Sequence, residues 1–442
     1  MADLIQDLCE MNIGGHIDDV NCVCPSYADD MTIIATNQKD MQLMLNTAFE
    51  HSRRWRYEIH PAKCNFLTFN DMVTDSSVKG HVVLKIGDTR IPKVNFTVHV
   101  GIPISSKNDI SQYVNDRCTS GKRKFCSLLG LGHKTGGLSP LTASKLYWAF
   151  SIPTMLFGAP VINYQASDVE KLELTHREIG KRIQFFPKTS ANPSATMPLG
   201  WLSIDGYITV LQMMYLWSLL RFNNIYRDIT ITRLVKMFHV TYDNHADIFS
   251  PIRRIFLKTK MLGIENLVKN ALNSGYLPSK RSWRLQIVNA VRSVEVKQFF
   301  LQCSCYGKLL YLRDYVTDLK PCIWWLICQK YPKCQSQCKT MMQLICNAHV
   351  LNTNNFNGSK RCILCNLCET ETIEHFILRC PMYEPYRHNI FEALGCRGDS
   401  MGVIMKKVLG LSDVSCETLI IVSSCVHKMY NHRANLLALL DT

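Results

Sequence analysis

The chain has 442 residues, 47% of them hydrophobic, and a formal net charge of +14 at pH 7. This length and composition predict two to four globular domains with apolar cores, and the absence of internal repeats excludes a repetitive or low-complexity protein. The surplus of Lys and Arg favours a polyanionic partner such as nucleic acid, although many basic proteins have other functions.

The beginning of the chain and the cysteines bear on the cellular compartment. No apolar leader with a cleavage site follows Met1, and residues 2–7 predict the start of an amphipathic helix. The longest apolar runs, such as residues 322–328, are too short to span a bilayer. We therefore expect the 20 cysteines to be reduced, in a nuclear or cytoplasmic protein that is neither secreted nor associated with a membrane.

The most informative stretch is Tyr27-Ala28-Asp29-Asp30, which is followed by an apolar run over residues 31–35. Because β-branched residues favour strands and Asp favours turns, this stretch predicts a β-hairpin with an acidic tip. Carboxylates at such a tip can hold Mg²⁺, a hard cation that suits chemistry on nucleoside triphosphates. The alternative is an acidic surface turn, since neighbouring Asp side chains in an extended segment point to opposite faces.

An amphipathic helix is predicted after this hairpin, with Asn37 as its N-cap. Arg53, Arg54, Trp55 and Arg56 lie near its end and are candidates for binding nucleic acid. The apolar positions of the helix, mostly at spacings of three and four, are Met41, Met44, Leu45, Ala48, Phe49 and Trp55.

With Tyr27-Ala28-Asp29-Asp30 the chain resembles a reverse transcriptase, and specifically the polymerase of non-LTR (LINE-type) retrotransposons. Gly14-Gly15-His16-Ile17 looks like that family's approach to its catalytic hairpin. Pro61-Ala62-Lys63 is similar to the motif with a lysine beside the leaving pyrophosphate, although His60 stands where the family more often has Asn. Val98-His99-Val100-Gly101-Ile102 looks like the hairpin that grips the primer, so Gly101 is a candidate nucleic-acid contact.

The resemblance implies RNA-templated DNA synthesis with an RNA template and a DNA primer as partners. A primer 3′-hydroxyl would attack the α-phosphate of a dNTP beside two Mg²⁺ ions roughly 4 Å apart. Asp29 would be the principal metal ligand and Asp30 its supporting carboxylate. Tyr27 would form a wall near the primer end, and Lys63 would donate a proton to pyrophosphate.

A third aspartate, from an upstream strand, completes the metal site in that family. Few residues precede Tyr27, so we expect the fingers and half of the palm to be absent, with Asp18 and Asp19 as surface residues. The chain alone is then expected to lack polymerase activity. Three alternatives remain open: a second chain that supplies the missing palm half, a non-catalytic zinc-containing nucleic-acid-binding protein, and a purely structural zinc protein.

Helical patterning dominates from residue 106 onward. Ser139-Pro140 predicts a helix start, with Ser as N-cap and Pro at the first helical position. Ser167 and Glu170 have the spacing of a capping box for the next helix. On the apolar face of that helix, His176 is more readily explained as a satisfied core histidine than as a ligand.

Basic clusters recur through this helical half. They would bind phosphates without reading sequence, although a solvated helix face has the same pattern. Among these clusters, residues 280–284 are the strongest candidate for binding nucleic acid, because Trp283 could stack on a base. The candidate contacts in this half are Lys122, Arg123, Lys124, Lys280, Arg281, Trp283 and Arg284.

Cys362, Cys365, His375 and Cys380 have the spacing of a Zn²⁺ knuckle. Two thiolates three positions apart can converge on one ion from a tight turn, and Pro381 keeps Cys380 out of the α region. Cys368 leaves an alternative open, because it forms a second pair of the same spacing with Cys365.

The resemblance favours the first set of four ligands for structural Zn²⁺. The C-terminal knuckle of many LINE-type elements is followed by Cys-Pro-x-Tyr and an Arg, which Cys380-Pro381-Met382-Tyr383 and Arg387 match here. Other cysteine pairs, such as Cys334 and Cys338, have no histidine at a fitting distance and are expected to be ordinary thiols.

These features together predict an α+β fold in five parts. Residues 1–105 would form a partial palm of β-hairpins and a helix, and residues 106–300 a helical thumb and connector. A Cys-rich helical linker (301–355), a zinc knuckle (356–395) and a C-terminal helix (396–442) would follow, and the tail over residues 416–440 is expected to pack on the rest as a helix. Polar stretches at residues 188–198 and 352–360 are the expected linkers.

Overall fold

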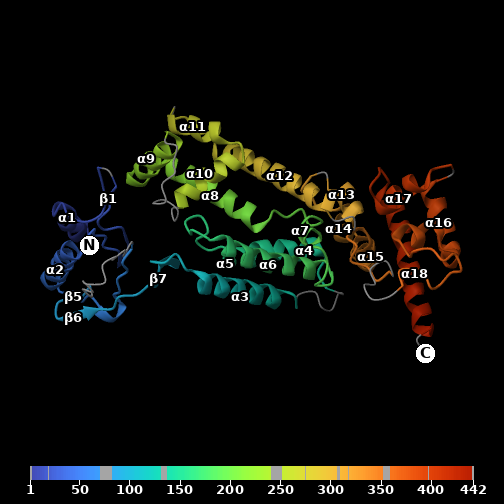
Figure 1. Cartoon of the computed structure of the whole chain (residues 1–442), viewed down its shortest axis with the longest axis horizontal. Helices are drawn as coiled ribbons and strands as arrows, with labels where there is room; N and C mark the ends of the chain where they lie inside the picture. Colours follow the sequence, from blue (N-terminus) through green and yellow to red (C-terminus); the bar gives the residue numbers. More distant parts are fainter. Residues whose placement is uncertain are drawn as a thin grey trace. The chain divides into compact units, whose positions relative to one another are not determined.

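The computed structural model describes residues 2–17, 19–69, 82–130, 137–239, 251–273, 275–305, 309–316, 318–351, 359–396 and 398–440. Most of the predicted linker 352–360 therefore lies outside the described residues. The fold is α+β, as predicted: the described strands come before residue 106, and the described segments after it are helices and loops (Figure 1). No described helix is long and apolar enough to cross a membrane.

The chain divides into two compact units, each assembled from segments far apart in sequence. The helices α3 (Ser111–Leu128), α6 (Ala166–Ile183), α8 (Ile204–Arg221) and α12 (Lys280–Cys305) have residues in both units. Unit 1 comprises Met1–Asp116, Phe157–Asp168 and Ile208–Ile287. Unit 2 comprises Arg117–Leu156, Val169–Tyr207 and Val288–Thr442.

Unit 1 begins with two helices that pack together. The amphipathic helix α1 (Ala2–Glu10) buries Leu4 and Leu8 in a cluster with Met44 and Ala48 of α2 (Gln38–Trp55). As predicted, the Asn37 side chain caps α2 by accepting a hydrogen bond of 2.9 Å from the backbone N–H of Asp40.

Trp55 follows the spacing of the apolar positions of α2 but does not lie in the core. Its side chain is 60% exposed, whereas Met44, Leu45 and Ala48 are buried. Helical spacing alone would place Trp55 on the same face. However, Trp55 is the last residue of the helix, and its ring lies against His51 with the ring centroids 6.2 Å apart. The apolar clusters under the helix therefore end before Trp55.

The strands of unit 1 form four antiparallel hairpins among the described residues. The third hairpin buries Leu84, Ile86 and Ile91 in a cluster with Leu45 of α2. Such two-stranded ribbons are only marginally stable alone, so this packing holds them. The hairpins are β1 (His16–Ile17) with β2 (Val20–Asn21), β3 (Ser26–Tyr27) with β4 (Asp30–Met31), β5 (Leu84–Ile86) with β6 (Thr89–Ile91), and β7 (Phe96–His99) with β8 (Ile102–Ser105).

The remainder of unit 1 is helical and contains two anchored tryptophans. Trp217 of α8 donates its Nε1–H to the Pro278 carbonyl at 2.9 Å, and Trp283 of α12 donates to the Met213 carbonyl at 2.9 Å. These bonds fix the start of α12 against α8. The other helices here are α9 (Ile225–His239), α10 (Pro251–Met261) and α11 (Glu265–Asn273).

Unit 2 has an aromatic core around His176. The imidazole is fully buried between the Tyr147 hydroxyl at 2.8 Å and the Leu202 carbonyl at 3.1 Å, and burial lowers its pKa to about 3. The prediction of a satisfied core histidine is therefore confirmed. Tyr147 opens the π-helix η3 (Tyr147–Ser151), between α4 (Pro140–Leu146) and α5 (Ile152–Met155).

The two predicted helix starts have different outcomes. Ser139 caps α4, accepting a hydrogen bond of 3.3 Å from the Thr142 N–H, with Pro140 at the first helical position, as predicted. The prediction of a capping box at Ser167 and Glu170 is wrong. Helix α6 already begins at Ala166, and the Asp168 carboxylate accepts from the Gln165 N–H at 3.2 Å.

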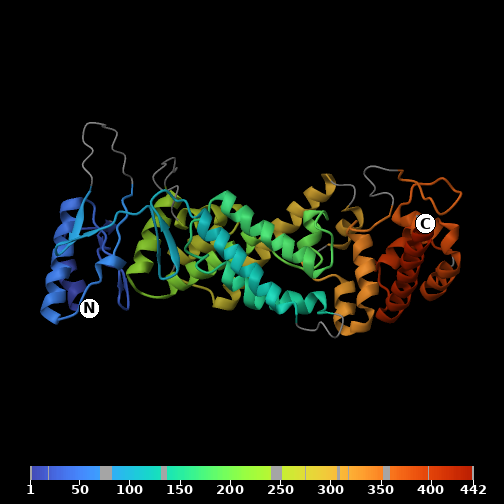
Figure 2. The same ribbon diagram turned by 90° about the horizontal axis from the view of Figure 1, so that it is seen from below.

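The C-terminal part of unit 2 is a helical bundle. As predicted, residues 416–440 form one helix, α18 (Cys416–Leu440), which packs on the rest (Figure 2), but the predicted C-terminal helix does not extend back to residue 396, because a separate helix ends at Gly410. Its neighbours are α15 (Gln335–Ile345), α16 (Glu384–Leu394) and α17 (Met401–Leu409). The other elements of unit 2 are α7 (Asn192–Thr196), α13 (Leu310–Tyr315), α14 (Ile323–Lys330), η6 (Pro332–Cys334), η8 (His375–Arg379) and η9 (Pro381–Tyr383).

Candidate functional site

The acidic hairpin is the tip of a longer antiparallel ladder. Tyr27 pairs with Asp30 across the turn residues Ala28 and Asp29. The pairing continues where the Thr32 N–H donates to Pro25 O at 3.0 Å and the Ile34 N–H donates to Val23 O at 2.8 Å. Ala28 has a φ of 56°, a left-handed conformation that tight turns between strands use.

The side chains at this tip face solvent. Tyr27 is 68% exposed, and Asp29 and Asp30 are exposed as well. Opposite residues of an antiparallel pair lie on the same face, so the Tyr27 ring and the Asp30 carboxylate share one side of the hairpin. The tip therefore offers two carboxylates and an aromatic ring to a ligand in solvent.

Gly14 and Gly15 support the base of this hairpin. The Gly15 N–H donates to Ile34 O at 2.9 Å. A Cβ added at Gly14, whose φ is 104°, would lie 2.8 Å from the same oxygen, and one added at Gly15 would lie 2.6 Å from the Ile34 side chain. Glycine is required at both positions because the backbone passes so close to this strand.

A second predicted element lies beside the acidic hairpin. The Thr32 hydroxyl is 3.4 Å from Nε2 of His99, at the end of β7. The turn after His99 is anchored at Gly101, whose carbonyl accepts from the Tyr113 hydroxyl at 3.0 Å. Gly101 has a φ of 77°, and a Cβ there would lie 2.7 Å from the Phe157 ring. The structure thus joins the β3–β4 and β7–β8 hairpins through side chains.

Lys63 is exposed at the end of η1 (Pro61–Lys63). The segment that follows is held in place, since the Phe66 N–H donates to Pro92 O at 3.1 Å and the Val94 N–H donates to Phe66 O at 2.9 Å. Among the contacts of the described residues, none joins the Lys63 ammonium to Asp29 or Asp30.

The donor set at the hairpin tip fits a hard cation but is incomplete for one. Carboxylate oxygens are the ligands that Mg²⁺ prefers. Within the described part of the chain, no cluster of three or more Asp, Glu, His or Cys includes Asp29 or Asp30. Asp18 lies outside the described residues, and Asp19 is exposed, as expected.

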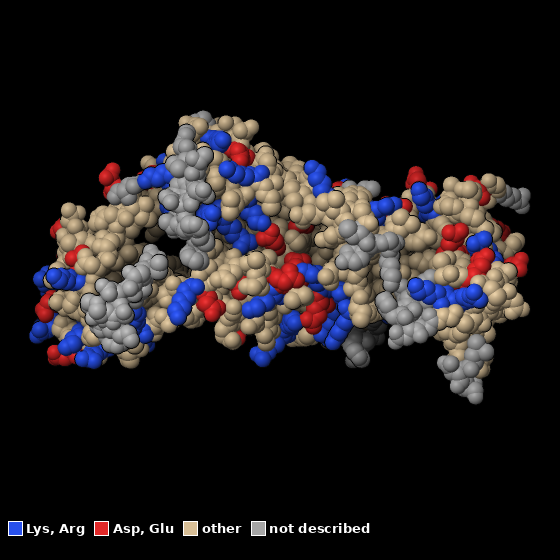
Figure 3. Space-filling view, in the orientation of Figure 1, with Lys and Arg blue, Asp and Glu red and all other residues tan. Residues whose placement is uncertain are grey.

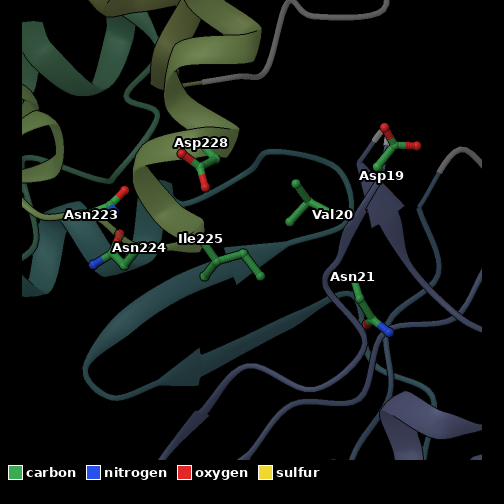
Figure 4. A pocket seen from close by; sticks show the side chains of 7 residues that line it. All are labelled: Asp19, Val20, Asn21, Asn223, Asn224, Ile225 and Asp228. Carbon is green, nitrogen blue, oxygen red and sulfur yellow. The ribbon is translucent and has the colours of Figure 1, made fainter. Parts of the chain in front are cut away.

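Asp19 lines a shallow polar pocket of about 450 Å³ in unit 1 (Figure 4). The amides on its other side already have structural partners. Asn224 Oδ1 accepts from the Arg227 N–H at 3.1 Å, and Asn223 Oδ1 accepts from the Arg227 side chain at 3.3 Å. These two amides therefore fix the start of α9.

The cations predicted to bind nucleic acid differ in their exposure and in their ion pairing within the protein. Arg53, Arg54 and Arg56 are exposed at the end of α2, and Arg53 lies 3.7 Å from Glu50. On α3, Lys122 is paired with Glu178, whereas Arg123 and Lys124 are exposed. Lys280, Arg281 and Arg284 are exposed on α12. Figure 3 shows basic side chains gathered over α8 and α10.

The prediction that Trp283 stacks on a base is wrong. Its side chain is 0% exposed, and its Nε1–H is already bonded to the Met213 carbonyl. Trp283 is therefore a core residue of unit 1. Neighbouring charges in the sequence suggested a surface ring, but a 26-residue helix with exposed cations still has an inner face, on which Trp283 lies.

The four predicted thiol and imidazole ligands come together in unit 2. The ligand atoms of Cys362, Cys365, His375 and Cys380 all lie within 4.8 Å of one another. Tetrahedral Zn²⁺ with bonds of 2.0–2.3 Å sets its ligand atoms about 3.5–3.8 Å apart. The distance of 3.5 Å between Cys365 Sγ and His375 Nε2 fits that spacing. Cys368, which is exposed and lies outside the cluster, is not one of the four.

Local backbone structure explains how the ligands meet. The Cys362 N–H donates to Glu369 O at 2.8 Å, which closes the loop that carries the first two thiols. The Cys380 N–H donates to His375 O at 2.8 Å in a π-turn, and Cys380 itself is extended, with φ −62° and ψ 121°. The prediction that Cys380 leaves the α region is confirmed. The wide π-turn brings it back beside His375.

The surroundings orient and desolvate these ligands. His375 Nδ1 lies 3.0 Å from Glu369 Oε2, which leaves Nε2 facing the thiols. Arg387 donates to the Cys380 carbonyl at 2.5 Å, so the predicted Arg following the motif supports the backbone there. Burial raises the pKa of Cys380 to about 12 and also raises the pKa of Cys362. A bound metal would therefore have to displace thiol protons.

Sequence reasoning missed three residues around this cluster. The sequence could have indicated Glu369 as a partner of His375, because the two are close in sequence and metal-binding histidines usually donate to a carboxylate. Glu371 and Arg433 form a buried ion pair with N–O distances of 2.6 and 2.7 Å. They are 62 residues apart, and no local pattern in the sequence indicates their pairing.

Residues 1–125 match the model of a family described as reverse transcriptase (RNA-dependent DNA polymerase). The matched segment contains the acidic hairpin, Lys63 and the β7–β8 hairpin. It supports an RNA-directed DNA polymerase relationship for this part of the chain, with nucleic-acid substrates. No curated protein matches the sequence.

Proposed function

We propose that residues 1–105 are part of the palm of a non-LTR-type reverse transcriptase, and that the chain binds an RNA template and a DNA primer. The observation that carries this proposal is the contact between Thr32 and His99. It brings the turn of a primer-grip-like hairpin beside the hairpin of Asp29 and Asp30. Both hairpins lie within the segment that matches the reverse transcriptase family.

The roles of the residues follow from their positions on the hairpin. Asp29, in the exposed turn, would be the principal Mg²⁺ ligand, and Asp30 would support it. Tyr27, opposite Asp30, would bound the space for the primer end. Lys63 would protonate the leaving pyrophosphate. Mg²⁺ bound at this tip would stabilise the attacking and leaving oxygens of phosphoryl transfer.

The chain alone is proposed to bind template and primer without extending them. The described residues offer two carboxylates at the tip and no third ligand in a cluster with them. A second polypeptide that supplies another carboxylate would complete such a site. The Cys362, Cys365, His375 and Cys380 cluster is proposed to hold structural Zn²⁺, since four protein ligands leave no open position for catalysis.

Primer extension and binding, measured on the same preparation, test this proposal. A labelled DNA primer on a homopolymer RNA template should bind the chain in a salt-dependent way and should not be extended with Mg²⁺ and dNTP. Extension by the wild-type chain that disappears in Asp29→Asn would show that the described carboxylates suffice for catalysis. That result would contradict the proposal that the metal site is incomplete. Failure to bind at low salt would contradict the proposed substrate.

A non-catalytic zinc-containing nucleic-acid-binding protein is the second candidate. The exposure of both carboxylates without a third ligand favours it, because the tip could be a relic of a metal site. Binding of nucleic acid would then be indifferent to Asp29→Ala and to removal of Mg²⁺. Binding that Mg²⁺ strengthens through Asp29 would favour the palm.

A further inference from the structure

Two cations meet at Trp217, where α8 ends and α12 begins within unit 1, and two more follow on the first turns of α12. Arg221 Cζ lies 5.5 Å from the centre of the Trp217 ring, and Lys280 Nζ lies 5.9 Å from the same ring. Arg281 and Arg284 follow on α12, where both are exposed. We refer to Arg221, Lys280, Arg281 and Arg284 as the α8–α12 cluster.

The described part of the chain gives these four cations no ion-pair partner. The first turn of α12 also has no acidic residue. Three of the cations stand at or near a helix N-terminus, where positive charge is unfavourable. By contrast, Lys122 on α3 is paired with Glu178. An uncompensated cluster of this kind is suited to a polyanion.

An exposed aromatic ring adjoins the cluster. Phe222 is 56% exposed, and Arg221 Cζ lies 5.6 Å from the centre of its ring. The Arg221 guanidinium is thus in cation–π range of both Trp217 and Phe222. Trp217 is 7% exposed and bonded to Pro278, so it serves as a fixed support. Unlike the buried Trp283, Phe222 therefore has an exposed ring on which a base can stack.

We propose that the α8–α12 cluster and Phe222 form a binding site for single-stranded nucleic acid. The cations contact successive phosphates, and an unpaired base stacks on Phe222. In a duplex the faces of the bases are covered by their neighbours, so a protruding phenyl ring adds nothing there. This inference rests on the proposed function only in that both take nucleic acid as ligand, and it requires no polymerase chemistry.

Fluorescence anisotropy with the full chain tests the proposal. The probes are a labelled 12-nucleotide single strand and a 12-base-pair duplex, each titrated over a series of salt concentrations. Phe222→Leu should weaken single-strand binding by roughly fivefold to a hundredfold and leave its salt slope unchanged. Arg221→Gln and Lys280→Gln should each reduce that slope by about 0.7.

Matched controls are available in unit 2. Phe150→Leu removes a ring that is 50% exposed, and Lys333→Gln removes an exposed cation, both outside the cluster. Neither should change single-strand affinity by more than about twofold, and circular dichroism should show that every variant is folded. Equal losses of single-strand and duplex affinity in Phe222→Leu, or equal effects of Phe222→Leu and Phe150→Leu on single-strand binding, would overturn the proposal.

The outcome is separable from that of the proposed function. Asp29→Asn should leave single-strand binding at this site intact, because Asp29 is not part of the cluster. If the cluster variants have no effect while template and primer still bind, this inference fails and the palm proposal stands. If the cluster variants act as expected but Mg²⁺ has no site at Asp29, this inference stands and the palm proposal fails.

Discussion

Arg433 of α18 makes two hydrogen bonds to Glu371, at 2.6 and 2.7 Å, and both side chains are almost completely buried. Glu371 also donates its backbone N–H to Lys360 O at 2.9 Å, in the pairing that closes the loop of the Cys/His cluster. This ion pair therefore ties the last helix of the chain to the proposed zinc centre.

Removing one partner of this pair should be costly. Arg433→Leu removes the guanidinium that contacts both oxygens of a buried carboxylate, so we expect it to destabilise unit 2 by about 3–5 kcal/mol. Urea unfolding followed by circular dichroism measures the change. The double variant Arg433→Leu with Glu371→Leu should regain most of the loss, because no unpaired charge remains.

The partly exposed pair of Lys407 and Asp399, at 2.7 Å, provides the control for this prediction. Lys407→Gln should cost no more than about 1 kcal/mol, since solvent screens that pair. A similar cost for Arg433→Leu and Lys407→Gln would show that the buried pair does not hold the bundle together.

The Cys/His cluster should bind one Zn²⁺ per chain. Cys362→Ser and Cys380→Ser should abolish binding, while Cys368→Ser should retain it, because Cys368 lies outside the cluster. Glu369→Gln should weaken binding by about tenfold to a hundredfold, since Glu369 orients His375. Metal content and the absorbance of the Co²⁺-substituted protein report these changes, and zinc lost in Cys368→Ser would refute the ligand set.

Glu295 should make stability depend on pH. Burial raises its pKa from 4.5 to about 7, although Ser203 donates to the carboxylate at 2.6 Å through its hydroxyl. The folded state then holds a proton that the unfolded state releases between pH 4.5 and 7. Stability should fall by about 3 kcal/mol as pH rises through that window.

Glu295→Gln isolates this effect. The variant cannot titrate at residue 295, so its stability should lack that fall and exceed the wild-type value most clearly above pH 7. Urea unfolding at pH 4.5, 6 and 8 gives the comparison. Parallel pH profiles for the two proteins would mean that Glu295 titrates normally in the folded state.

Features encoded within a few residues could be predicted from the sequence. Asn37 and Ser139 cap their helices because capping is a contact with the next three residues. The acidic hairpin and the Cys/His cluster were likewise recognisable from residue type and spacing. Pro381, directly after Cys380, indicated that the chain leaves the helix there.

Features that depend on distant packing could not be predicted. Trp283 is buried, with its N–H donated to Met213, 70 residues away, and Trp55 is exposed where the apolar clusters have ended. The contact between Thr32 and His99 spans 67 residues. Periodicity indicates which face of a helix is apolar, but not how far a core extends along it.

The central claim is that the tip of the β3–β4 hairpin is a divalent-metal site. Iron(II) substituted for Mg²⁺ cleaves the backbone beside its site when peroxide and ascorbate are added, so mapping the fragments locates the metal. Asp88 provides a matched control, because it is an exposed carboxylate at the tip of the β5–β6 hairpin.

Cleavage should cluster at residues 27–32 and should be suppressed by excess Mg²⁺. It should disappear in the double variant Asp29→Asn with Asp30→Asn and persist in Asp88→Asn. Cleavage that is absent from residues 27–32, or that continues unchanged in the double variant, would contradict a metal site at this hairpin.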